Sequence, residues 1–218
     1  MKLPLRLIEE ARFVIGVDLG QARDFTAIAV VERMPQKPDW FTGKEPPELL
    51  HLRHLERMPL GTNYVAQVDH VQKLVGAVWS ETVVDQTGVG RGVVDLFRDR
   101  GIALHAVTIT AGNAEPSYEL AKGGQNWKVS KRLLVSTLVA LLHSERLKIA
   151  SALPLAETLT AELLSFDVTT SASGRETFNA REGQHDDLVL AVALACWNAT
   201  RVRKPPPKGV VRPFNLSR

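Results

Sequence analysis

The chain has 218 residues, of which 44% are hydrophobic and 23% are charged, and its formal net charge is +3 at pH 7. This length and apolar content suffice to bury the core of one domain of the larger kind, and the charge is too small to indicate nucleic-acid binding by itself. No apolar run can span a membrane and the N-terminus lacks the features of a secretory signal, so we expect a cytoplasmic protein with no membrane partner. The single cysteine, Cys196, excludes an internal disulfide and is expected to be buried.

The first third of the chain predicts three strands and a helix. The expected strands run over 13–19, 25–32 and 49–56, and the expected helix runs over 64–79. The turn-like stretch 20–24 between two strands rich in β-branched residues favours a hairpin. In the helix, apolar residues recur at the spacing of one helical face. Three antiparallel strands in sequence are the result.

The rest of the chain predicts alternating helices and strands. We expect a strand over 82–85, a helix over 93–98, a strand over 103–109, a loop over 110–125, a helix over 128–143, a short strand over 147–149, a helix over 155–165, a hairpin over 166–180 and a closing helix over 186–202. A strand, helix, strand unit calls for a parallel pair with a right-handed crossover. The pattern therefore predicts an α/β fold of the ribonuclease H-like kind, in which a mixed central sheet of three antiparallel strands and then parallel strands is flanked by helices and carries an extra β-hairpin.

The domain organisation follows from these elements. Residues 1–11 are expected to be an N-terminal linker, and residues 12–202 one folded domain. The remaining residues, 203–218, are basic and begin near three consecutive prolines, which cannot continue a helix or join a sheet interior. We expect this segment to be a flexible tail.

Acidic residues lie at the ends of three separate apolar segments. Asp18 closes the first strand, Asp85 closes the strand at 82–85, and Asp186 and Asp187 open the closing helix. Strands that end in Asp can bring their carboxylates together at the carboxyl edge of one sheet. Clustered carboxylates repel one another unless a divalent cation lies among them. The pattern predicts a metal site for phosphoryl chemistry.

Two Mg²⁺ or Mn²⁺ ions would supply both an activated water and charge relief for the leaving oxygen of a phosphodiester. In this interpretation Asp18 bridges the ions, Asp85 completes one coordination sphere, and Asp187 or Asp186 completes the other. Adjacent helical residues point in different directions, so we predict that Asp186 caps the closing helix and that Asp187 is the ligand. His185 is either an auxiliary ligand or proton shuttle, or a plain surface histidine.

Basic residues gather around Trp127. They are Lys122, Lys128, Lys131 and Arg132. This group either faces DNA phosphates or forms a solvated helix start. The Gly-rich stretch 85–90 precedes a helix as a phosphate loop does, but the chain contains no Gly-Lys-Ser/Thr ending, so ATP hydrolysis is not expected.

Three segments together, 14–20, 83–90 and 183–191, resemble the C-terminal nuclease domain of large terminase subunits from tailed bacteriophages. The connecting segments 128–131, 146–149 and 159–163 look like the same family, and the resemblance covers about residues 12 to 201. It implies a metal-dependent endonuclease that cuts concatemeric viral double-stranded DNA, with little sequence preference, during genome packaging.

The resemblance also implies site residues and partners. The acidic positions carry over as Asp18, Asp85 and the pair Asp186 and Asp187, and the segment 128–131 matches a basic element that could face DNA. An ATPase motor domain, the small terminase subunit and the portal would be partners. This sequence departs from the family pattern because the motor is absent from it, so it is either an excised or truncated nuclease domain or a stand-alone protein of related descent. Motor activity is not assigned to it.

Other interpretations stay open at this point. A Holliday-junction resolvase of the same superfold would share the acidic cluster but act on branched DNA. A noncatalytic DNA-binding module would bind without cleaving. An actin-like nucleotide-binding protein would need two duplicated lobes, for which the chain is too short. Cleavage of linear, branched and supercoiled DNA with and without Mn²⁺ distinguishes these possibilities.

Overall fold

The computed structural model describes residues 12–21, 24–112, 115–121, 123–170, 176–180 and 185–201. The described strands are β1 (Phe13–Asp18), β2 (Ala27–Met34), β3 (Leu49–Arg57), β4 (Ser80–Asp85), β5 (Leu104–Thr110), β6 (Ser117–Ala121), β7 (Gly124–Ser130), β8 (Leu147–Ile149), β9 (Phe166–Thr170) and β10 (Glu176–Ala180). The described helices are α1 (Tyr64–Ala77), α2 (Arg91–Asp99), α3 (Lys131–His143), α4 (Ala156–Ser165) and α5 (Asp187–Thr200). None of the helices in these ranges is both long and apolar enough to cross a bilayer.

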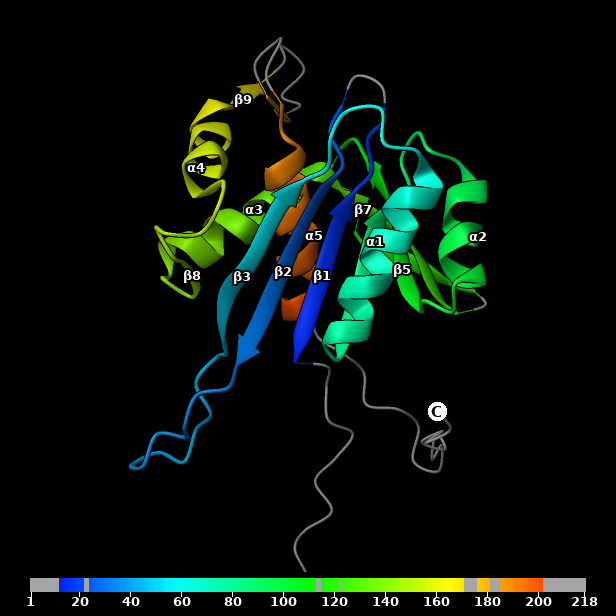
Figure 1. The fold of residues 1–218 in the computed structure, drawn as a ribbon. Coiled ribbons are helices and arrows are strands. Elements are labelled where there is room, and N and C mark those ends of the chain that lie inside the picture. Colours follow the sequence, from blue (N-terminus) through cyan, green and yellow to red (C-terminus); the bar gives the residue numbers. More distant parts are fainter. Residues whose placement is uncertain are drawn as a thin grey trace, which may run out of the picture.

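The central sheet is mixed, as predicted. Its eight strands lie in the order β6-β7-β5-β4-β1-β2-β3-β8. Strands β1, β2 and β3 pair antiparallel, whereas β4, β5 and β7 extend the sheet from β1 in parallel (Figure 1). Val17 on β1 pairs with Val84 on β4, so Asp18 and Asp85 come next on their strands and lie at neighbouring strand ends. The predicted hairpin near residue 170 is also confirmed, with β9 and β10 pairing antiparallel.

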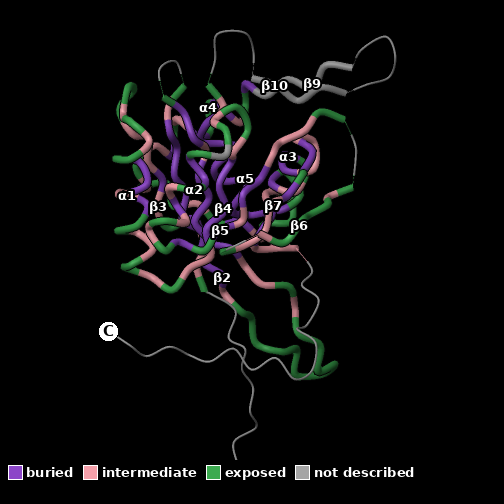
Figure 2. The backbone as a smooth tube through the Cα atoms, turned by 90° about the vertical axis from the view of Figure 1, so that its right-hand side faces the viewer, coloured by how far each residue is buried: buried purple, intermediate pink, exposed green. Residues whose placement is uncertain are grey.

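Helices cover both faces of the sheet. One core contains the side chains of α5, α3 and α4 that pack with β2 and β3, and the other contains those of α1 and α2 with Ile15 and Val17 of β1. Helix α5 is buried from Asp187 to Asn198, and Cys196 within it is fully buried. Figure 2 shows this helix and the central strands as the most buried part of the molecule.

Helix α5 lies directly against β1 because Gly16 has no side chain. A Cβ atom at Gly16 would lie 2.1 Å from the backbone oxygen of Ala191 and 2.9 Å from the backbone nitrogen of Ala195. Any larger residue would push the helix off the strand. This contact fixes the position of the N-terminus of α5 along β1, and so its distance from the end of that strand.

The predicted loop over 110–125 is wrong, because β6 and the first residues of β7 lie there. The predicted start of the helix at 128 is also wrong. Lys128 belongs to β7, which pairs with β5 up to Ser130 opposite Thr110, and α3 begins only at Lys131. The physical reason is the cap: the Ser130 hydroxyl accepts a hydrogen bond from the Leu133 N–H at 3.3 Å, which sets the first turn of the helix there.

The connection between β2 and β3, residues 35–48, forms an arm that projects from the end of the sheet opposite to Asp18 (Figure 1). Its tip is tied by Asp39, whose Oδ1 accepts hydrogen bonds from the N–H groups of Phe41 at 3.0 Å and Thr42 at 2.7 Å. Trp40 and Phe41 at this tip are each 86% exposed. We refer to residues 35–48 as the β2–β3 arm.

Candidate metal centre

The carboxyl edge of the sheet brings the predicted acidic residues together. Asp18 ends β1, Asp85 ends the parallel neighbour β4, and α5 begins at the same edge with Asp186 and Asp187. Ala191, which rests on Gly16, lies one helical turn after Asp187, so the packing of α5 on β1 sets where these two residues lie. The four carboxylates come from three elements that are distant in sequence.

The negative charges of Asp18 and Asp85 are disfavoured at this edge when no cation is bound. Burial raises the pKa of Asp18 well above its usual range, the carboxylates of Asp85, Asp187 and Asp186 raise it further, and Lys131 opposes them. Burial raises the pKa of Asp85 to about 6, although the Thr87 N–H donates to its Oδ1 at 2.7 Å and lowers it. A cluster of hard oxygen ligands with excess negative charge is the donor set that Mg²⁺ and Mn²⁺ prefer.

Asp186 and Asp187 have different surroundings. Asp186 is partly exposed, and its Oδ2 forms an ion pair with Lys131 Nζ at 2.7 Å. Asp187 is 4% exposed, and its Oδ2 lies 3.3 Å from Arg57 Nη2 and 3.9 Å from His185 Nδ1. Burial raises the pKa of Asp187 to about 6, while Arg57 and His185 lower it. Among the described residues none donates a hydrogen bond to Asp187 Oδ2, whose contacts with Arg57 and His185 lack hydrogen-bond geometry.

The predicted capping role of the Asp186 side chain is wrong. Asp186 occupies the N-cap position of α5, but its side chain makes no capping hydrogen bond within the described part of the chain. Instead, the Val189 N–H donates to Glu162 Oε2 of α4 at 3.1 Å. The reason is competition: the Asp186 carboxylate turns to the Lys131 ammonium, and a carboxylate from another helix satisfies the backbone.

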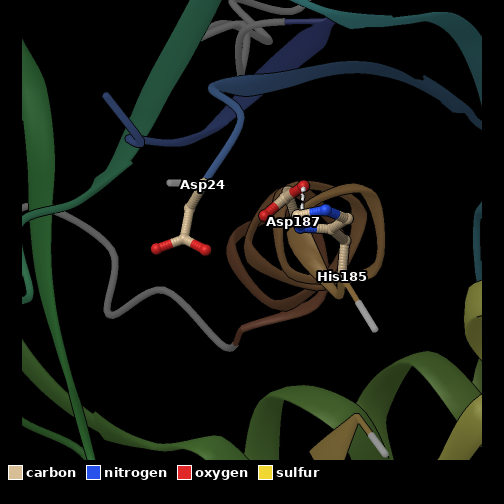
Figure 3. Close-up of side chains that lie close together, drawn as sticks. All are labelled: Asp24, His185 and Asp187. Atoms are coloured by element: carbon tan, nitrogen blue, oxygen red, sulfur yellow. Dashed lines mark ion pairs between the residues drawn. The ribbon is translucent and has the colours of Figure 1, made fainter. Parts of the chain in front are cut away.

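Three residues at the site were not predicted from the sequence: Asp24, Arg57 and Glu162. The ligand atoms of Asp24, His185 and Asp187 all lie within 4.8 Å of one another, around the start of α5 (Figure 3). The Asp24 backbone lies close to Gly20, which follows β1: a Cβ atom at Gly20 would lie 2.2 Å from the Asp24 backbone oxygen. The glycine four positions before Asp24 is the only local signal of this placement.

His185 lies at the acidic cluster but is exposed. Its ring meets the Phe25 ring edge to face, with centroids 5.1 Å apart, and its Nδ1 is 3.9 Å from Asp187 Oδ2. The same Phe25 ring has the Arg57 guanidinium over its face at 4.9 Å. This position fits an auxiliary role at the site, which stays a prediction.

The predicted DNA-binding residues fall in different places. Lys128 is exposed on β7 and lines a cleft of about 660 Å³, together with Gln86, which directly follows Asp85. Lys131 is engaged by Asp186 and so belongs to the acidic cluster, and Arg132 is half-buried in the first turn of α3. Lys122 lies outside the described residues. A contact of these residues with DNA remains a prediction.

Comparisons with known proteins place this geometry in context. No protein-family model matches the chain. The large terminase subunit of Thermus phage G20c is 25% identical to it over 185 residues, which are 84% of this chain and 31% of that protein. The chain thus spans about a third of the length of this relative.

Two solved structures show the likeness in three dimensions. The large terminase nuclease of thermophilic phage G20c, crystallised with bound magnesium, superposes with a TM-score of 0.59 at 23% identity, over 86% of this chain and 81% of that one. The large terminase nuclease domain of bacteriophage SPP1, with bound manganese, gives a TM-score of 0.50 at 12% identity, over 86% of each chain. The resemblance predicted from the three motifs is therefore confirmed: the chain has the ribonuclease H-like fold of large terminase nuclease domains.

Proposed function

We propose that the chain is a metal-dependent endonuclease that cuts double-stranded DNA, and that it acts on concatemeric viral DNA during genome packaging. The observation that carries the proposal is the meeting of Asp18, Asp85 and Asp187 at one sheet edge, with the pKa of each carboxyl raised. A site that stores unbalanced negative charge fits a divalent cation. The magnesium and manganese in the similar nuclease structures support the same assignment.

Asp18, Asp85 and Asp187 would hold the cations, which we propose to be two Mg²⁺ or Mn²⁺ ions. Bound there, the ions would supply an activated water and charge relief for the leaving oxygen. Asp18 is central, because the three other carboxylates all act on its pKa. We assign Asp187 rather than Asp186 as the ligand, since Asp187 is buried and raises the pKa of Asp18 more than Asp186 does. Asp186 is partly exposed and forms a hydrogen-bonded ion pair with Lys131.

The DNA would cross the carboxyl edge beside the cleft that Gln86 and Lys128 line. Lys128 would contact a phosphate, which fixes the strand near Asp85 without reading its bases. Binding should therefore be insensitive to sequence and steeply dependent on salt. In a whole terminase, an ATPase motor domain, the small terminase subunit and the portal would be the partners of this domain.

The proposal is tested by incubating the chain with linear, branched and supercoiled DNA, with EDTA or with Mn²⁺. We expect Mn²⁺-dependent cleavage of linear and supercoiled DNA, and no cleavage by the Asp85→Asn variant. Cleavage restricted to branched DNA would favour a resolvase instead. Binding without cleavage on every substrate would leave only a DNA-binding module.

A further inference from the structure

Arg57, the last residue of β3, is fixed at the start of α5 by three partners. Its guanidinium contacts the Glu162 carboxylate, its Nη2 lies 3.3 Å from Asp187 Oδ2, and its central carbon lies 4.9 Å from the centre of the Phe25 ring. The side chain is only 17% exposed. A planar guanidinium held by two carboxylates and a ring face has one orientation, which a lysine ammonium cannot reproduce.

Glu162 connects this arginine to the backbone of α5. One of its oxygens contacts Arg57, and the other accepts the hydrogen bond from the Val189 N–H at 3.1 Å. Val189 is the third residue of α5, whose N–H is one that an N-cap side chain ordinarily binds. Because Glu162 accepts this hydrogen bond, the Asp186 carboxylate does not have to cap the helix and instead pairs with Lys131 at the carboxyl edge.

We propose that Arg57 and Glu162 are positioning residues of the metal centre, which together hold the Asp187 carboxylate and the first turn of α5 in the orientation that receives a cation. The inference rests on the proposed function, because it takes Asp187 as a cation ligand. The ion pair to Arg57 orients Asp187 Oδ2 without a hydrogen bond, so a lone pair stays available. Partners that orient metal ligands typically change metal affinity by about 10- to 100-fold when they are removed.

Two effects of removing the Arg57 charge have opposite signs. A positive charge near the site repels a cation, so its loss alone would strengthen Mn²⁺ binding. The loss of orientation would weaken Mn²⁺ binding. The sign of the change in affinity therefore distinguishes a positioning residue from a simple counter-charge.

The experiment is calorimetric titration of the full chain with Mn²⁺ alone. We expect Arg57→Met to weaken Mn²⁺ binding about tenfold or more. Arg57→Lys keeps the charge but loses the planar guanidinium that fixes the two carboxylates, so it should also weaken binding. Glu162→Gln keeps an oxygen for the Val189 N–H yet no longer fixes Arg57, so its Mn²⁺ affinity should fall while its melting temperature stays above that of Glu162→Ala.

Arg53 provides the matched control on the same strand. Its side chain is 50% exposed, and its Nε binds Glu32 at 2.6 Å, a pairing that does not involve the carboxyl edge. Arg53→Met should leave the Mn²⁺ affinity unchanged, and a loss equal to that of Arg57→Met would overturn the inference.

Unchanged or stronger Mn²⁺ binding by folded Arg57→Met would also overturn the inference. If that variant does not fold, Arg57→Lys decides by the same criterion. A wild-type chain that binds no Mn²⁺ would contradict the proposed function itself, which is a distinguishable failure.

Discussion

The carboxyl edge and the β2–β3 arm use polar and apolar side chains in opposite ways. At the edge, Asp85, Asp187 and Glu162 are carboxylates buried from water. On the arm, Trp40 and Phe41 are large apolar side chains left in water, with their rings meeting edge to face at 5.2 Å. Each region departs from the usual rule that charge lies outside and apolar surface inside.

The difference lies in what maintains each region. The edge holds desolvated carboxylates whose charge is unfavourable without a cation beside it, so the core must keep α5 and the strands in place. The arm is tied by local hydrogen bonds, such as those from the N–H groups of Phe41 and Thr42 to Asp39. Changes at the edge should therefore alter activity and stability together, whereas changes on the arm should alter neither.

The largest effect is expected at the edge. Asp18→Asn or Asp85→Asn should reduce cleavage at least about a hundredfold, because each removes a carboxylate that we propose as a cation ligand. The metal-free variants should melt no lower than wild type, since one of several repelling charges is gone. Plasmid cleavage in Mn²⁺ and thermal melting in EDTA measure both effects. Asp39→Asn on the arm is the matched acidic control, and near wild-type cleavage by either edge variant would refute the assignment.

The packing of α5 on β1, which positions the carboxyl edge, can be disrupted without changing an acidic residue. Gly16→Ala places a Cβ atom 2.1 Å from the Ala191 backbone oxygen, so either α5 or β1 must move. We expect a loss of about 3 kcal/mol in the free energy of unfolding, measured with urea, and weaker Mn²⁺ binding.

Gly76→Ala is the control for this change. A Cβ atom there meets nothing within 4 Å on α1, so the substitution should be neutral or stabilise the protein by up to about 1 kcal/mol. Equal destabilisation by the two variants would refute the tight contact between α5 and β1.

The raised pKa of Asp85 predicts how the stability of the metal-free protein depends on pH. Burial raises the pKa of Asp85 to about 6 in the folded protein, from the ordinary aspartate value of about 4 that applies when the chain is unfolded. The folded state therefore holds this proton more tightly, and its stability falls as pH rises from about 4 to about 6. Across this window, Asp85→Asn should gain up to about 3 kcal/mol relative to wild type. Urea unfolding in EDTA at pH 4 and pH 7 measures the gain, and a difference that stays constant with pH would contradict it.

A smaller effect is expected beside the edge. Lys128→Ala should weaken DNA binding a few-fold at low salt and reduce the salt slope by about one contact, because one phosphate contact is lost. Fluorescence anisotropy with two unrelated duplexes at several salt concentrations tests this. A change confined to one of the duplexes would show base readout instead.

The smallest effect is expected on the arm. Trp40→Ser with Phe41→Ser should change the free energy of unfolding by less than about 0.5 kcal/mol and leave cleavage unchanged, because both rings are exposed already. Melting and plasmid cleavage measured beside the Asp18→Asn variant complete the contrast. A clear loss of cleavage would mean that the arm supports the edge.

Much of the fold could be predicted because its signals are local. Clear patterns mark the strands that end in Asp18 and Asp85 and the apolar helix that begins with Asp187. Parallel pairing then brings the ends of the two strands together. Strand β6 was missed because it lies at the sheet edge, where Tyr118 and Leu120 are exposed and no buried alternation marks a strand. Such edges carry little hydrophobic pattern.

The rest of the site depends on contacts between distant positions. Arg57 and Glu162 are separated by 105 positions, and neither an arginine ending a strand nor a glutamate inside a helix has a local signature of such a pair. The local preference for aspartate at a helix start predicts a capping role for the Asp186 side chain, and a tertiary contact with Lys131 overrides it. Sequence patterns predicted the carboxylates that meet at this edge, whereas the contacts of Arg57 and Glu162 with them become visible only in the fold.

Because Cys196 is buried within α5, its rate of chemical labelling reports how often this helix leaves the core. Burial raises the pKa of this thiol to about 12, so at neutral pH it has almost no reactive thiolate and is out of contact with reagents. Alkylation can proceed only when α5 leaves the core, and its rate then measures how often that happens. Because the same helix begins with Asp187, a cation held at the far end should slow the labelling of a sulfur atom that it never touches.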